Sequence, residues 1–204
     1  MKNIKYSIII AALCLLISNT KAQSIDASAK LKEAQTAYEA HKLDDARMAL
    51  QDAITAINIA IGKEILAALP TKMSDMSYTE KDDNVSSAGG FAGLTVSRNY
   101  GSEKKNAKIV ILGDSPLLTS INAVLAMPAF MTGSNPDQKR VKIGGYKGLL
   151  NKSTNSESKV VSYSIQVPVN QTLITIDVKG IDSENDAIAL ANTLPMDKIA
   201  KLAQ

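Results

Sequence analysis

The chain has 204 residues, with 23 Lys and Arg against 20 Asp and Glu, a formal net charge of +3 and only 4% aromatic residues. This length allows a single domain with a helical appendage. One Cys and one His exclude a disulfide framework and a cysteine-rich metal site.

The N-terminal segment has the three regions of a secretory signal peptide. Lys2 and Lys5 precede an apolar run over 6–17, and a polar stretch ends at the small residue Ala22. The run is shorter than the roughly 20 residues that a membrane-spanning helix needs, although an uncleaved anchor is the alternative. We therefore predict that residues 1–22 are a signal peptide, cleaved near Ala22, and that the protein is exported to the periplasm or the medium.

Removal of residues 1–22 changes the chemistry that is open to the protein. Lys2, Lys5 and Lys21 would leave together with Cys14, and the remaining chain has 20 basic and 20 acidic residues and no thiol. Such a chain lacks the broad electrostatic attraction that nucleic-acid binding uses. We therefore expect no nucleic-acid partner, no disulfide and no Cys metal site.

Residues 23–70 are predicted to form a helical hairpin. Between 25 and 69 helix-forming residues dominate, Pro is absent, and apolar residues recur at three- and four-residue spacing. The pattern breaks near His41, after which Asp44 and Asp45 are placed to complement the dipole of a second helix. Pro70 ends that helix. The stretch 54–65 is apolar on more than one face, which predicts burial on two sides.

Small residues are spaced along both predicted helices and would let them approach closely. They are Ala34, Ala37, Ala46, Ala49 and Ala53. Their spacing resembles one tetratricopeptide-type helical hairpin, and a single unit of that type cannot bury its faces alone. The hairpin is therefore expected to pack on the rest of the chain, on a second copy or on a partner. Two roles stay open, a structural cover for a sheet and a docking element for a partner.

Residues 71–92 are expected to be a linker loop, since polar residues and Gly concentrate there. The glycines at 89, 90 and 93 lack the Lys-Ser/Thr ending of a phosphate-binding loop, and a strand pattern follows them. We therefore expect no phosphate site in this segment.

Residues 93–204 are predicted to be an α+β domain. Strand patterns cover 94–100, 108–112, 138–143, 145–150, 159–167 and 171–178, with a hairpin turn at 170–171. Helices are expected to begin at Ser115 and Ser183, each a good N-cap, with a final short helix over 196–202. Consecutive strands favour an antiparallel sheet of about five to six strands with helices on one face.

Residues 113–116 resemble the Gly-Asp-Ser motif of secreted esterases. Such enzymes need a downstream His, and the only His of this chain is His41, far upstream of Ser115. The acidic groups over 82–84 and 182–186 lack the Gly and Glu of a calcium loop. We therefore predict no catalytic residues, no metal site and no cofactor. An enzyme with unrecognised Ser or carboxylate chemistry stays an alternative.

Two clusters are candidates for a partner surface. One is a basic strand region and the other an apolar loop over 127–131, and their residues are Lys139, Arg140, Lys142, Lys147, Phe130 and Met131. Basic residues also protect exposed sheet edges, and an apolar loop also tucks over a sheet. If the basic cluster is functional, its partner is anionic, such as a cell-wall polymer or a lipid headgroup.

Three runs resemble an uncharacterised family of exported bacterial proteins over roughly the C-terminal half of the chain. They are GLTVSRxY at 93–100, DSPL at 114–117 and RVxIxGYK at 140–147. The order of predicted elements is similar to the PsbP-like α+β fold, and this resemblance implies binding and accessory roles. We therefore expect an exported, non-catalytic binding or accessory protein of the bacterial envelope, with a protein partner. A binder of anionic cell-wall or lipid surfaces is an alternative.

Overall fold

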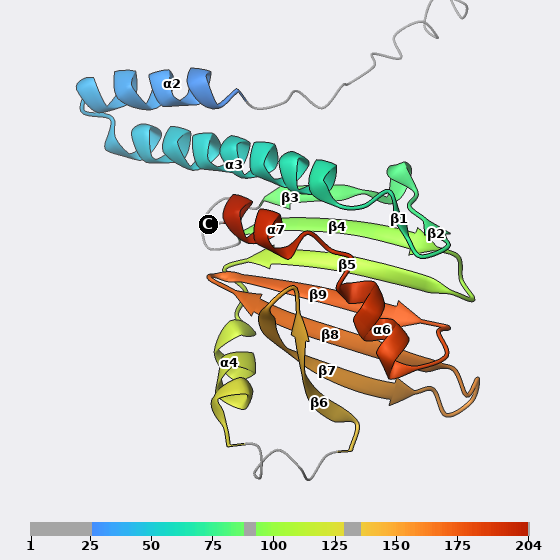
Figure 1. Cartoon of the computed structure of the whole chain (residues 1–204). Helices are drawn as coiled ribbons and strands as arrows, with labels where there is room; N and C mark the ends of the chain where they lie inside the picture. The colour runs from blue at the N-terminus through green and yellow to red at the C-terminus, as the bar shows by residue number, and fades with distance from the viewer. Residues whose placement is uncertain (1–25, 88–92, 129–135, 204) are drawn as a thin grey trace, which may run out of the picture.

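The computed structural model describes residues 26–87, 93–128 and 136–203 (Figure 1). A hairpin of two helices, α2 (Ala27–Glu39) and α3 (Leu43–Ala68), precedes a seven-stranded antiparallel sheet with further helices. The predicted α+β class and N-terminal hairpin are confirmed, and the sheet has one strand more than the five to six expected.

The ends of the two hairpin helices follow from local chemistry. The Asp26 side chain caps α2, because its Oδ1 accepts a hydrogen bond from the N–H of Ser28 at 2.9 Å. His41 adopts a positive φ of 57° in the turn between the helices. Leu69, the residue before Pro70, is extended and ends α3, as the clash between a proline ring and a preceding helical residue requires.

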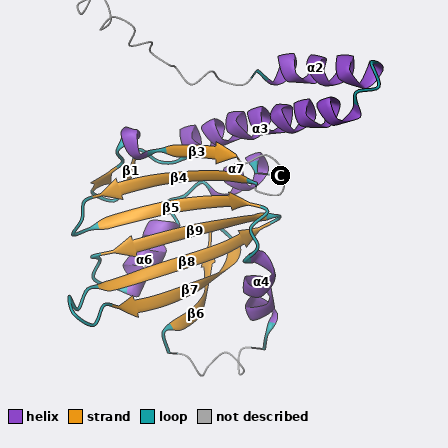
Figure 2. Cartoon of the chain, turned by 180° about the vertical axis from the view of Figure 1, so that it is seen from behind, coloured by secondary structure: helices purple, strands orange, loops and turns teal. Residues whose placement is uncertain are grey.

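The sheet is built from seven strands whose order in space differs from their order in the chain. The strands are β3 (Asn84–Ser87), β4 (Leu94–Gly101), β5 (Asn106–Gly113), β6 (Gln138–Ile143), β7 (Tyr146–Thr154), β8 (Val161–Val169) and β9 (Thr172–Lys179). They lie in the order β3-β4-β5-β9-β8-β7-β6, and every neighbouring pair is antiparallel. The chain leaves β5, builds β6 to β8 as a meander, and returns to place β9 beside β5 (Figure 2).

The segment expected to be a linker contributes regular structure. Along the chain, α3 is followed by two short strands, β1 (Lys72–Met73) and β2 (Met76–Ser77), and by a 3₁₀ turn, η1 (Glu80–Asp82), before the first strand of the sheet. Residues 84–87 then pair with β4 as the edge strand β3. Three of these four residues are polar, as suits an edge strand with one exposed face, so composition alone could not distinguish this strand from a loop.

One face of the sheet carries the main core. Along β8, Tyr163, Ile165, Val167 and Val169 are buried and alternate with less buried side chains, and the same alternation runs along β4, β5 and β9. This face is covered by α3, by α6 (Glu184–Ala191) and by α7 (Met196–Leu202), whose buried residues join the same core. The predicted capping of α6 is confirmed, because the Ser183 Oγ accepts a hydrogen bond from the N–H of Asp186 at 3.2 Å.

The helix α4 (Leu118–Ala126) packs against β7 and β8 on the opposite face. Leu149 and Leu173 are buried but lie outside the main core, to which their neighbours Leu150 and Ile174 belong. Because successive strand residues point to opposite faces, Leu149 and Leu173 belong to the α4 side. The prediction that the helices cover one face therefore holds for α3, α6 and α7, while α4 covers part of the other face.

Candidate functional site

The structure separates the residues that a serine hydrolase would have to bring together. Asp114 lines a cavity of about 600 Å³ between α3, α7 and the ends of β4, β5 and β9. Ser115 is buried, and its Oγ accepts a hydrogen bond from the N–H of Leu117 at 3.4 Å. His41 lies in the α2–α3 turn, at the end of the hairpin that points away from the sheet (Figure 1). No Ser–His pair forms between these residues.

Ser115 does not cap α4 in the predicted way. Leu118 is the first helical residue, and its N–H donates to the carbonyl oxygen of Ser115 at 3.2 Å in a preceding turn. Helix α4 therefore begins later than Ser115 and Pro116 predict, because residues 115–117 form that turn. Among the described residues, no group of three His, Cys, Asp or Glu side chains is placed to hold a metal ion.

The four basic candidates lie on two faces of the sheet. The Lys139 Nζ pairs with Glu184 of α6 at 2.7 Å, on the side of the main core. Arg140 points to the other face and donates to the carbonyl oxygens of Val124, at 2.8 Å, and of Met127, which close the C-terminal end of α4. These contacts satisfy two of the four cations within the fold.

The two remaining cations, Lys142 and Lys147, face each other in the β6–β7 register. Both are exposed and lie on the face of Arg140, since alternate residues of a strand share a face. Phe130 and Met131, the apolar candidates, lie outside the described residues.

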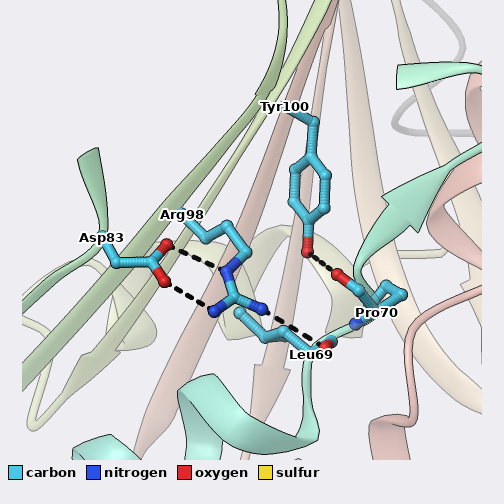
Figure 3. Close-up of polar contacts among 5 residues, drawn as sticks. All are labelled: Leu69, Pro70, Asp83, Arg98 and Tyr100. Atoms are coloured by element: carbon cyan, nitrogen blue, oxygen red, sulfur yellow. Dashed lines mark hydrogen bonds and ion pairs between the residues drawn. The ribbon is translucent and has the colours of Figure 1, made fainter. Parts of the chain in front are cut away.

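A buried polar cluster fixes the end of α3 to the sheet (Figure 3). Arg98 of β4 donates from Nε and Nη2 to the two carboxylate oxygens of Asp83, at 2.9 and 2.6 Å, and from Nη1 to the carbonyl oxygen of Leu69 at 3.3 Å. The hydroxyl of Tyr100 donates to the carbonyl oxygen of Pro70 at 2.8 Å. Hydrogen bonding to Asp83 raises the pKa of Arg98. The cluster thus holds the chain that leaves α3 at two successive carbonyl groups.

The C-terminal half of α3 lies on the sheet, and Gly62 allows a close approach. A Cβ at Gly62 would meet a methyl carbon of Val85, and would lie 2.9 Å from Leu94 Cδ1 and 3.2 Å from Val96 Cγ2. Ile65 is fully buried in the core. Because this half is fixed, α2 and the N-terminal half of α3 project past the sheet as an overhang (Figures 1 and 2).

Alanines form the seam between the two helices of the overhang. Ala34 of α2 is buried, as are Ala46, Ala49, Ala53 and Ala56 of α3. The predicted close approach of small residues is seen at this seam, although Ala37 lies on its groove side and is only partly buried. A salt bridge of 3.0 Å between Lys30 and Asp52 spans the two helices. The seam uses only small side chains, so the large apolar residues of the hairpin point elsewhere.

These large apolar residues gather on one side of the overhang, which we call the hairpin apolar face. Its residues are Leu31, Tyr38, Leu43, Leu50, Ile54 and Ile57, and each is between 44% and 67% exposed. Leu31 and Tyr38 are seven residues apart on α2, and the α3 residues recur at intervals of three, four and seven. Each set forms a stripe along its helix, on the same side of the alanine seam.

The other side of the overhang has a different character. A shallow groove there is lined by residues of both helices, among them Lys32, Glu33, Asp45, Met48 and Asp52, and by none of the hairpin apolar face. The hairpin is therefore amphipathic: the groove side carries charged residues and the opposite side carries the hairpin apolar face.

The hairpin apolar face continues into the folded domain. Ile61, one turn beyond Ile57 on the same stripe of α3, packs against the core and lines the cavity that also holds Leu202 of α7. The prediction of burial on two sides holds where the sheet lies beneath α3. It fails at Ile54 and Ile57, which are 57% and 44% exposed.

This face is as large as the largest apolar patches on monomeric proteins. Six large side chains at about half exposure present on the order of 600 Å², at the upper end of the largest patch on a typical monomer. The six residues carry no charge, and Arg47, seven residues before Ile54 at the edge of the α3 stripe, is exposed and paired with Asp44 at 3.2 Å. Sequence periodicity identifies these residues as helical and apolar. Which of them stay exposed depends on the tertiary structure, because it depends on where the rest of the fold covers the hairpin.

Comparison of the chain with known protein families, with curated proteins and with solved structures finds no match. Within the described part of the chain, no helix has both the length and the apolar character that crossing a membrane requires.

Proposed function

We propose that the protein is an exported, non-catalytic binding or accessory protein of the bacterial envelope, and that it docks onto a polypeptide partner through the hairpin apolar face. One observation carries the docking role. Large apolar side chains are exposed together on an overhang that the protein's own sheet does not cover. The largest exposed apolar patch of a monomeric protein is often a functional surface.

The chemistry of the face favours a polypeptide partner. Its six residues are apolar apart from the hydroxyl of Tyr38, and the cation beside them, Arg47, is paired with Asp44. Aliphatic side chains at three-, four- and seven-residue intervals suit the apolar stripe of a partner helix. The anionic-surface alternative is less well supported, because Lys139 and Arg140 are occupied by contacts within the fold.

The anchoring of α3 supports the same role. Arg98 and Tyr100 hold the two carbonyl groups that follow α3, and Gly62 brings the helix close to β3 and β4. The overhang therefore extends from a fixed base, and a docking surface held rigidly loses less conformational entropy on binding. Export is proposed from the signal-peptide pattern of residues 1–22.

The docking role is tested by affinity capture from the host envelope with two matched variants. Ile54→Glu places a charge within the hairpin apolar face, while Met48→Glu places the same charge on the groove side of the same helix at similar exposure. We expect proteins captured by the wild type to be retained by Met48→Glu and to fall at least about tenfold with Ile54→Glu. Equal capture by all three chains would contradict the docking role.

A further inference from the structure

We propose that the partner of the hairpin apolar face is a second copy of this chain, so that two hairpins pair about a two-fold axis into a four-helix bundle. The inference rests on the proposed docking function and names its partner. It follows from the area of the face, from its lack of charge and from the spacing of its residues.

The exposed area matches what a symmetric dimer needs. The six side chains present on the order of 600 Å², and a stable interface of standard size buries about 800 Å² on each partner. Exposed polar residues beside the two stripes, such as Gln35, Arg47 and Gln51, supply the difference as a rim. Pairing of two such faces would remove from water nearly all the large apolar side chains that the overhang exposes.

The lack of charge makes the face self-complementary. In a two-fold interface, a residue near the axis meets its own copy, so a charge there would face a like charge. None of the six residues is charged, and Arg47 at the edge of the α3 stripe is paired with Asp44 of its own helix. The ion pair between Lys30 and Asp52 lies at the seam with the polar groove. Two copies can therefore approach without bringing unpaired like charges together.

The spacing of the residues suits a bundle. Leu43, Leu50 and Ile57 recur every seven residues on α3, with Ile54 between the last two, and Leu31 and Tyr38 are also seven residues apart. Apolar residues at such intervals form the inner positions of coiled coils and four-helix bundles. Each hairpin supplies two antiparallel helices with such a stripe on the same side, which is half of a four-helix core.

Sedimentation equilibrium of the purified protein, in the processed form that its host produces, tests the inference. We expect the wild type to have the mass of a dimer at micromolar concentrations. Ile54→Glu and Leu50→Glu are expected to weaken dimerisation at least about a hundredfold, because each places two carboxylates in one apolar interface. Met48→Glu is expected to remain a dimer. Circular dichroism and thermal unfolding of each variant establish that it is folded.

The outcomes separate this inference from the proposed function. A wild type that stays monomeric overturns the dimer, and if Ile54→Glu still reduces capture of envelope proteins, the docking role survives with a different partner. A dimer that both Ile54→Glu and Leu50→Glu leave intact also overturns the inference, since the interface then lies elsewhere. A monomer whose capture is insensitive to Ile54→Glu overturns both proposals.

Discussion

Arg98 and Asp83 form a two-point ion pair, with N–O distances of 2.9 and 2.6 Å and side-chain exposures of 7% and 11%. The guanidinium carbon of Arg98 also lies 4.1 Å from the centre of the Tyr78 ring. The same guanidinium holds the carbonyl oxygen of Leu69, where α3 ends. One side chain of β4 therefore ties together the sheet, the segment that precedes β3 and the base of the hairpin.

Replacement of Arg98 by Met is expected to destabilise the fold by about 3–5 kcal/mol, because it leaves the Asp83 carboxylate buried without its partner. Chemical denaturation of the wild type and of Arg98→Met measures the difference. The double variant Arg98→Met/Asp83→Asn removes the unpaired charge and is expected to recover part of the loss. A loss below about 1 kcal/mol would show that the pair behaves as an exposed surface pair.

The Tyr100 hydroxyl predicts a specific loss of stability at alkaline pH. Burial raises the pKa of Tyr100 from 10.0 to about 12. The neutral phenol is therefore favoured in the folded state, and its contribution is complete below pH 10 and is lost as the pH rises through the folded pKa.

Comparison with Tyr100→Phe isolates this effect. At neutral pH the variant is expected to be less stable by about 1 kcal/mol, since it lacks the hydrogen bond to Pro70. At a pH of about 11 that deficit is expected to shrink, because only the wild type must keep a buried phenol protonated. Urea denaturation at the two pH values measures both differences, and a deficit that stays constant would contradict the raised pKa.

The close contact at Gly62 predicts that a larger side chain lifts α3 from the sheet. Gly62→Leu would place its carbons against Val85 and Leu94. Overpacking of this kind destabilises the fold by about 1–3 kcal/mol, which we expect to outweigh the gain of about 1 kcal/mol in helix propensity. The matched control is Ala60→Leu, an exposed position on the same helix, with an expected change within about 0.5 kcal/mol. Thermal unfolding compares the two, and equal stabilities would show that α3 does not depend on the glycine.

The N-terminal segment predicts a processed chain. Protein recovered from the host is expected to begin at Gln23 and to lack Cys14, since cleavage near Ala22 removes the whole apolar run. Intact mass measurement and N-terminal sequencing test this directly. Recovery of the unprocessed chain from the cytosolic fraction would contradict export.

Periodicity and capping residues predicted most of the fold. Six of the seven sheet strands overlap their predicted ranges, and α6 begins at its predicted cap, Ser183. These elements were predictable because their apolar periods and caps are local properties of the chain. The strand β3 was not, because its sequence Asn84–Ser87 is polar and its pairing with β4 is non-local.

The candidate site was less predictable than the fold. The sequence indicates the hairpin as a possible docking element, but the predicted partner surface is the basic cluster together with Phe130 and Met131, which lie outside the described residues. Of the basic cluster, Lys139 and Arg140 make contacts within the fold. Their contacts come from two helices, α6 and α4, so the local pattern of the strand does not reveal them. The exposure of Ile54 likewise depends on where the sheet ends beneath α3, which no local pattern encodes.

Photo-crosslinking in the host tests the central claim, that the hairpin apolar face is an interaction surface, most directly. A photoreactive residue at position 54 lies within the face, and one at position 48 lies on the groove side of the same helix at similar exposure. We predict a discrete polypeptide adduct from position 54, with the mass of a second copy if the dimer inference is right, and none from position 48. No adduct from position 54, or equal adducts from both positions, would contradict the account.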